Sequence, residues 1–184
     1  MSKKVNDVIK CPKCKEQINY ERWVSINSNI NPEQKKILLS GTFGEVICPN
    51  CGVKSYLEYN FLYHDMQEKY MISVYDDYTD ALSEFFPIGG YRYRHVERIG
   101  DLVEKINIFD AGLNDIVMEI MKGVLKELLR IKGNLVFLKR EDSQFLFYML
   151  ETNKVFSIKP DMYYEILGDC SDEDLEEKFE FMRV

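Results

Sequence analysis

Two copies of one short cysteine motif constrain this chain more than any other feature of its sequence. The chain reads CPKC at residues 11–14 and CPNC at residues 48–51, so these pairs contain four of its five cysteines. Each short turn brings two sulfurs to one side, and the proline at its second position fixes the backbone angle φ. Two such pairs complete a closed tetrahedral site without an open coordination position. The sequence therefore predicts one structural zinc ion per chain, bound by Cys11, Cys14, Cys48 and Cys51.

A redox role is the alternative for the paired cysteines. A catalytic Cys-x-x-Cys motif usually opens a helix in a βαβ unit, whereas strand-like sequence follows both pairs here. The fifth cysteine, Cys170, lies among acidic residues in GDCSDEDLEE, which weaken a thiol as a nucleophile. We therefore interpret the paired cysteines as metal ligands and Cys170 as a free thiol without a reaction of its own.

The 33 residues between Cys14 and Cys48 carry their own secondary-structure signals. Residues 15–27 read as a strand, and a helix is expected over 31–41. Asn31 is a suitable N-cap with Gln34 at capping-box spacing, Pro32 suits the first turn, and Gly41 can end the helix. Further strands are expected at 42–47, 53–59 and 69–75. Residues 1–76 are therefore predicted to form a zinc-ribbon-like β module with an inserted helix.

A connector over residues 77–90 is expected to join this module to a second domain over residues 91–184. The connector is rich in turn residues, with Pro87, Gly89 and Gly90, and a short helix is expected at 79–86. The second domain opens with YRYRHV at 91–96, which reads as a strand.

Helices and a small meander are expected in the rest of the second domain. A helix over 101–109 precedes a longer one over 113–131, whose apolar residues recur at i, i+3, i+4 and i+7. After Gly133, three apolar runs predict a three-stranded antiparallel meander. Two helices follow, the last of them acidic and capped by Ser171 or Asp172. The expected fold class is therefore α+β.

Several of these segments resemble one protein family. The stretches CPKC, INPEQKKILLSGTF, CPNCG, NFLYHDMQEKYMI and YRYRHVERIGDLVEKINIFDAGLNDIVMEIMK together are similar to the CpXC family of prokaryotic proteins, over residues 8 to about 131. The resemblance implies metal ligation by the four paired cysteines and supplies no catalytic residue. Lys15 stands where Gly52 follows the second pair, which leaves the geometry of the first turn open.

The distribution of charge argues against strong nonspecific binding of nucleic acid. Residues 1–60 have nine Lys/Arg and six Asp/Glu, a net +3, whereas residues 135–184 have six and twelve, a net −6. Such binding requires many cations that neutralise phosphates. A nucleic-acid-binding protein that uses the ribbon with Arg92 and Arg94 is one alternative reading.

A hydrolytic enzyme that uses His64, Asp65 and His95 is the second alternative. His64 and His95 are the only histidines of the chain, and histidine is the commonest general base. His64 and Asp65 are neighbours in a strand-like segment, however, so their side chains are expected to point to opposite faces. No phosphate-binding loop, nucleophile elbow or dinucleotide-binding glycine motif is present in the sequence.

The interpretation that we carry forward is a zinc-stabilised binding or adaptor protein with a protein partner. The longest apolar run, FLFYML at 145–150, is far shorter than the roughly 18 residues of a membrane span. The first ten residues do not read as a secretory signal, so we expect a cytoplasmic protein. The wide apolar stripe of helix 113–131 is expected to pack in the core, and a homodimer through this helix is the alternative.

Overall fold

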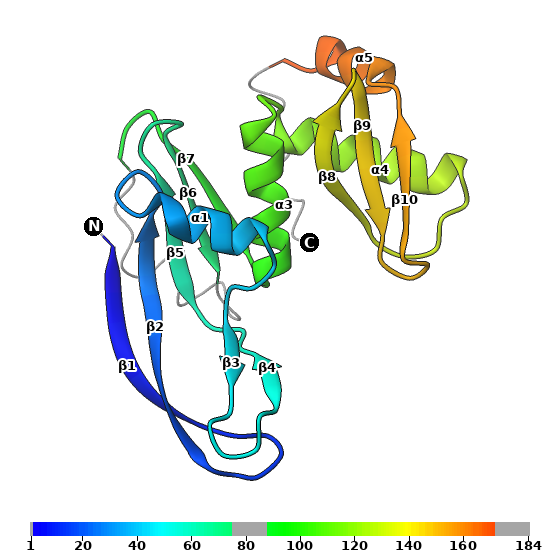
Figure 1. Ribbon diagram of the computed structural model, residues 1–184. Coiled ribbons are helices and arrows are strands. Elements are labelled where there is room, and N and C mark those ends of the chain that lie inside the picture. The colour runs from blue at the N-terminus through cyan, green and yellow to red at the C-terminus, as the bar shows by residue number, and fades with distance from the viewer. Residues whose placement is uncertain (1, 75–87, 172–184) are drawn as a thin grey trace. The chain divides into compact units, whose positions relative to one another are not determined.

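Figure 1 shows the computed structural model of the chain, which describes residues 2–74 and 88–171. The described residues form helices together with antiparallel and parallel strands, so the expected α+β class is confirmed. Internal contacts divide the chain into two compact units, residues 1–103 and 104–184, and each unit is described by itself. The expected division at residues 77–90 stays a prediction.

A five-stranded sheet is the frame of the first unit. Its strands follow the order β1 (Lys3–Lys10), β2 (Gln17–Asn27), β5 (Phe61–Asp65), β6 (Tyr70–Val74) and β7 (Arg92–Val96). The pairs β1/β2 and β5/β6 are antiparallel, whereas β2/β5 and β6/β7 are parallel. The sequence grouped β7 with the C-terminal part of the chain, but its pairing with β6 makes it an edge strand of this first sheet. The other edge strand, β1, was not expected from the sequence.

The two faces of this sheet differ in polarity. Ile26, Tyr63 and Ile72 stand in one row across β2, β5 and β6, and all three are completely buried. Helix α1 (Pro32–Leu39) lies across this face (Figure 1), and its Lys35 Nζ is 3.6 Å from Asp65 Oδ2. Because neighbouring strand residues alternate between faces, the side chains of His64 and its row partners belong to the opposite face.

A separate two-stranded sheet lies beside the distal half of the β1–β2 hairpin (Figure 1). It consists of β3 (Glu45–Ile47) and β4 (Lys54–Tyr56), which pair antiparallel. Gly44 begins this hairpin with φ +77°, and a Cβ added there would lie 2.5 Å from the carbonyl oxygen of Leu57. The Leu57 N–H also donates to the Gly44 carbonyl at 2.9 Å. Only glycine therefore fits at position 44, where the backbones approach closely.

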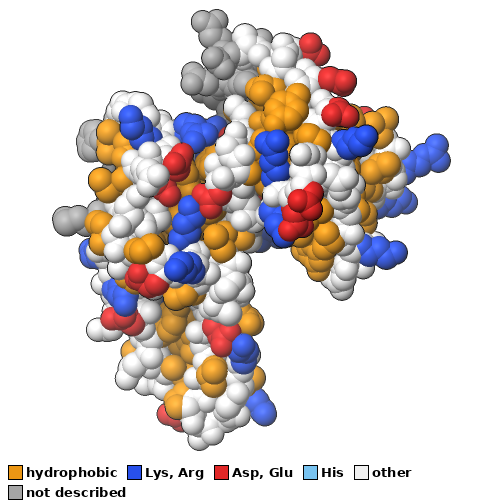
Figure 2. All heavy atoms as spheres, turned by 45° about the horizontal axis from the view of Figure 1, so that its top comes forward, with side chains coloured by type: hydrophobic (Ala, Val, Ile, Leu, Met, Phe, Trp, Pro, Cys, Tyr) orange, Lys and Arg blue, Asp and Glu red, His pale blue; other side chains and the backbone are white. Residues whose placement is uncertain are grey.

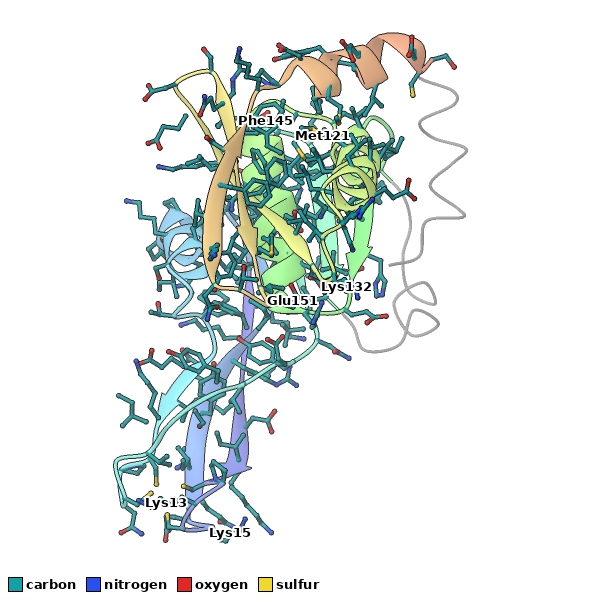
Figure 3. The ribbon with its side chains drawn as sticks, turned by 90° about the vertical axis from the view of Figure 1, so that its right-hand side faces the viewer. Lys13, Lys15, Met121, Lys132, Phe145 and Glu151 are labelled. Carbon is teal, nitrogen blue, oxygen red and sulfur yellow. The ribbon has the colours of Figure 1, made fainter. Side chains whose placement is uncertain are left out.

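The second unit packs helices against one three-stranded antiparallel meander. The sheet order is β10 (Lys154–Ile158), β9 (Gln144–Met149), β8 (Leu135–Glu141), so the expected meander is confirmed. The helices are α3 (Ile99–Asp110), which crosses the boundary between the units, α4 (Asp115–Leu128) and α5 (Asp161–Asp169). Figure 3 shows Met121 of α4 and Phe145 of β9 in the core of this unit, and both are completely buried.

Charged side chains join α3, α4 and the sheet inside the second unit. Glu104 is buried, and its Oε1 accepts from Lys122 Nζ at 2.8 Å and from the Phe137 N–H at 2.6 Å. Lys122 also lies 2.9 Å from Glu119, and Lys105 lies 3.1 Å from Asp115. Burial lowers the pKa of Lys122, but the charges of Glu104 and Glu119 raise it more, so the pKa lies above its usual value. Lys122 is therefore a buried cation with two carboxylate partners.

Some expected helix boundaries differ from the structure. Asn31 has no side-chain cap bond, because its amide donates to Glu33 at 3.2 Å instead of accepting from the helix. Helix α3 begins at Ile99 rather than Asp101, and Glu58 Oε2 accepts from the Ile99 N–H at 3.0 Å. Helix α4 is capped by Asn114 and ends at Leu128 rather than at residue 131. The helices expected at 79–86 and after Ser171 lie outside the described residues.

Candidate metal centre

Both cysteine pairs lie at hairpin turns of the first unit. Cys11 and Cys14 lie in the turn between β1 and β2, and Cys48 and Cys51 lie in the turn between β3 and β4. Lys13 and Lys15 mark the first of these turns in Figure 3, at the distal end of the hairpin. The four sulfur atoms lie within 4.8 Å of one another. The structure therefore brings together the four thiols that the sequence predicted as one ligand set.

The two turns have the same backbone geometry. In the first turn the Lys15 N–H donates to the Cys11 carbonyl at 3.1 Å, and in the second the Gly52 N–H donates to the Cys48 carbonyl at 2.9 Å. Lys15 has φ +64° and Gly52 has φ +69°. Lys15 thus adopts a left-handed backbone conformation, which only glycine adopts without steric cost. Its Nζ donates to the Pro12 carbonyl at 3.1 Å. The first turn is therefore the strained copy of the second.

The spacing of the sulfurs fits a tetrahedral ion. A metal with metal–sulfur bonds of about 2.3 Å places its four sulfurs about 3.8 Å apart. The Sγ atoms of Cys11 and Cys51 are 3.6 Å apart, and those of Cys14 and Cys48 are 3.6 Å apart as well. A disulfide needs a sulfur–sulfur distance of about 2.05 Å, and all four residues are free cysteines. The donor set can therefore hold one metal ion with four thiolates.

The thiols differ in how readily they release a proton. The Cys14 backbone N–H lies 3.5 Å from Cys11 Sγ, and this bond lowers the pKa of Cys11 to about 6 despite burial. The Val53 N–H lowers the pKa of Cys51, but burial and the three neighbouring thiols raise it more, to about 11. Metal binding requires thiolates and releases their protons, so an ion at this centre would bind less tightly as the pH falls.

Little apolar surface supports the two hairpins around the thiols. The local core contains two cysteines and two aliphatic side chains, and its buried members are Cys11, Ile18, Val46 and Cys48. Partly buried side chains from the same hairpins pack against this core, and they are Ile9, Cys14, Tyr20, Cys51, Val53 and Leu57. A core of this size stabilises a fold weakly. The ion would therefore supply much of the energy that holds the two hairpins together.

Asn50 is a residue of this centre that the sequence analysis missed. Its Nδ2 lies 3.6 Å from Cys14 Sγ, so the amide can donate to a thiolate of the other pair. Outer hydrogen bonds of this kind orient ligands and tune their charge. The only signal in the sequence is its place inside the second motif, because the contact with Cys14 joins residues that are far apart in the chain.

The structure does not bring His64, Asp65 and His95 together. Asp65 faces α1, where its carboxylate accepts from Ser28 Oγ at 2.9 Å and from the Gln67 and Glu68 N–H groups at 3.1 Å. His64 and His95 belong to the opposite face and stand in different rows of the sheet. Burial lowers the pKa of both imidazoles. The arrangement on which the hydrolase alternative depends is therefore absent from these three residues.

His64 instead belongs to a polar cluster with Asn27 and Tyr91. Its Nδ1 is 3.5 Å from Asn27 Nδ2, and its Nε2 is 3.3 Å from the Tyr91 hydroxyl. Asn27 Oδ1 accepts from the Asn29 N–H at 3.0 Å, which fixes the amide so that Nδ2 faces the histidine. Asn29 Oδ1 in turn accepts from the Met66 N–H at 2.7 Å. This cluster joins the β2–α1 loop to the β5–β6 turn.

The basic residues considered for nucleic acid do not form one continuous face. Lys10, Lys13 and Lys15 lie at the distal end of the β1–β2 hairpin, whereas Arg92 and Arg94 lie on β7, at the opposite edge of the sheet. Figure 2 shows Lys and Arg side chains interspersed with Asp and Glu on the face in view. These residues therefore do not form the continuous basic surface that would favour the nucleic-acid alternative.

No described helix is long and apolar enough to cross a membrane. No curated protein and no solved structure matches the chain. The family model described as "CpXC protein" matches residues 9–122, which include both cysteine pairs and most of the described helices and strands. The paired thiols of the metal centre are the feature that this family's description names, and the chain belongs to the CpXC family.

Proposed function

We propose that this chain is a zinc-stabilised binding or adaptor protein, with one structural zinc bound by Cys11, Cys14, Cys48 and Cys51. The observation that carries the proposal is the closed set of four thiols at tetrahedral spacing. Zinc is the metal that four cysteines in two Cys-x-x-Cys turns most often hold, and a four-thiolate site leaves no position for a substrate. Two hairpins clamped in this way form a zinc-ribbon-like module in the cytoplasm, where thiols stay reduced.

The exposed turns of this module are the proposed binding surface. Pro12, Lys13, Pro49 and Asn50 are all exposed around the four thiols. A surface that the metal fixes from below loses little conformational entropy when a partner binds, which favours affinity. Lys10 and Lys13 give this surface positive charge, so a protein partner with an acidic patch is the proposed ligand.

The metal content of the purified protein tests the proposed zinc centre. The purified chain should contain one zinc per molecule by elemental analysis. Substitution with Co²⁺ should give the absorption of a tetrahedral thiolate complex, and Cys170→Ser should leave stoichiometry and spectrum unchanged. A metal-free chain after expression with ample zinc, or an unchanged spectrum in Cys48→Ser, would contradict the zinc centre.

Charge reversal at the two cysteine-bearing turns tests the proposed binding surface. Proteins that crosslink to the wild-type chain in cells should no longer crosslink to the Lys10→Glu/Lys13→Glu variant. The matched control is Lys3→Glu/Lys36→Glu, which makes the same change in net charge at exposed lysines away from the turns. Equal loss in both variants would indicate a general charge effect. Recovery of nucleic acid with the wild type alone would favour the nucleic-acid alternative instead.

A further inference from the structure

Helix α4 has an apolar face that the described residues of the second unit do not cover. Val117, Met121 and Leu125 are buried in the core of the unit. On the outer face, Ile120 is half-buried, Val124 is 37% exposed and Leu128 is 66% exposed. Ile120, Val124 and Leu128 follow one another at i, i+4 and i+8, so they form a single ridge along the helix. Three large aliphatic side chains in one ridge are unusual on a surface that meets only water.

Gly123 lies beside this ridge, and the fold itself does not need a glycine there. It is an exposed interior residue of a helix that runs from Asp115 to Leu128, and a Cβ added to it would meet no atom within 4 Å. Glycine in a helix interior is less favourable than alanine by about 1 kcal/mol. No contact within the described residues requires glycine at this position. The missing side chain therefore points to close approach by another molecule.

The residues around Gly123 have the spacing of a packing hole. Ile120, Gly123, Val124 and Glu127 stand at i, i+3, i+4 and i+7, which is the set of four residues that receives one side chain from a facing helix. With glycine at one corner, the hole is deep enough for a branched aliphatic side chain. Val124, which lies at the centre of the ridge, is a side chain of this size on the same helix.

The geometry points to a second copy of this chain as the occupant, with two α4 helices antiparallel and a two-fold axis at Val124. Such an axis places Val124 in the hole above the partner's Gly123, and it places Ile120 beside the partner's Leu128. Every exposed member of the ridge thus receives an apolar neighbour from the ridge itself. A self-complementary surface of this kind is what a two-fold interface requires.

The charges along α4 favour the antiparallel arrangement. Glu119 lies in its first half and stays partly exposed while it pairs with Lys105 and Lys122, whereas Arg130 lies beyond its last turn. An antiparallel pair brings opposite ends of the helix dipoles together. Arg130 forms no ion pair within the part of the chain that the structure describes, and the two-fold axis brings it near the partner's Glu119. A parallel pair would place like charges side by side.

Sedimentation of the full chain with its metal tests this interface. The wild type should change from monomer to dimer as concentration rises, and Gly123→Leu should raise the dissociation constant at least tenfold. Helix content should not fall, because leucine favours a helix more than glycine does and a Cβ at this position meets no atom within 4 Å. The matched control is Gly100→Leu, at another exposed helical glycine with open space around it, which should dimerise like the wild type. A wild type that stays monomeric at all concentrations, or equal weakening by both substitutions, would overturn the proposal.

Disulfide trapping tests the position of the axis. In a Cys170→Ser background, Val124→Cys should form a disulfide-linked dimer under mild oxidation. Leu128→Cys should not, because the two copies of residue 128 would be about 12 Å apart along the helices. Leu128 is the more exposed of the two, so random collision would favour the opposite result. Fast crosslinking through Leu128→Cys would contradict the antiparallel interface.

Discussion

Lys15 and Gly52 follow equivalent cysteines and share a left-handed backbone, but they reach it at different cost. A residue with a Cβ pays roughly 1–2 kcal/mol for this conformation, whereas glycine adopts it freely. Lys15 recovers part of the cost through the bond from its Nζ to the Pro12 carbonyl. A short side chain at position 52 could not form a bond of this kind. The second turn therefore depends on glycine, whereas the first tolerates lysine.

Substitution of Gly52 by alanine should therefore weaken the metal centre. A Cβ at this position meets no atom within 4 Å, so the backbone strain acts alone. We expect a loss of about 1 kcal/mol, which corresponds to about fivefold weaker metal affinity. Competition with a chromophoric chelator measures the change. The control is Gly89→Ala, at a glycine with equally open surroundings and no positive φ. Unchanged affinity in Gly52→Ala would mean that the second turn relaxes without strain.

At the scale of elements, a metal at the proposed centre would join two hairpins that share only a small apolar core. Cys48→Ser should remove the metal and abolish protection from hydrogen exchange in β3, β4 and the cysteine-bearing ends of β1 and β2, because the shared core is small. Metal binding of this type contributes on the order of 10 kcal/mol in isolated zinc peptides. Protection in α4 should persist, and Cys170→Ser should behave like the wild type throughout. Retained protection in β3 and β4 of Cys48→Ser would show that the hairpins fold without an ion.

The buried charges between α3, α4 and β8 give a second prediction at this scale. Glu104→Ala leaves the Lys122 ammonium with a single carboxylate partner and leaves the Phe137 N–H without its acceptor. Removing one member of a buried ion pair typically costs about 3–5 kcal/mol. Glu104→Gln should cost less, because its amide oxygen can still accept from Phe137. Urea unfolding measures both, and equal losses would indicate that the charge alone matters.

The elements also show what the sequence could and could not predict. Helix α4 and the meander follow local periodicity, so their existence could be predicted, and the cysteine spacing predicted the grouping of four thiols. The strand β1 could not be recognised in KKVNDVIK, because it lies at an edge and is mostly exposed. The parallel pairing of β7 with β6 and the contact of Asn50 with Cys14 join distant residues. No local pattern encodes such pairings.

At the scale of the whole molecule, net charge decides which large partners can approach. Only the first 60 residues are positive, with nine basic and six acidic side chains, and four thiolates on one divalent ion would add a local −2. The last 50 residues have twelve acidic and six basic side chains. These charges repel a polyanion over a Debye length of about 8–10 Å. The balance favours a protein over a nucleic acid as the partner.

Random duplex and single-stranded DNA should therefore bind weakly or not at all near 0.15 M salt. Fluorescence anisotropy with labelled oligonucleotides at several salt concentrations measures this. Sub-micromolar affinity that falls steeply with salt would instead indicate release of counterions from phosphates, and would favour the nucleic-acid reading. A variant without residues 169–184 is the informative comparison. If this deletion alone produced binding, the acidic terminus would act as an electrostatic gate.

The distance along the chain between the two cysteine pairs has a consequence for how the protein is made. The first pair leaves the ribosome 33 residues before the second begins, so an ion that arrives early meets only two thiolates. Completing the site then closes a long loop, and a crosslink across a loop of this length removes about 4 kcal/mol of chain entropy from the unfolded state. Ligation of an ion by all four thiolates would therefore be a late event in synthesis. The bonds from Cys48 and Cys51 would form only after β3 has been synthesised, and a cell short of metal would accumulate chains whose two hairpins are not crosslinked.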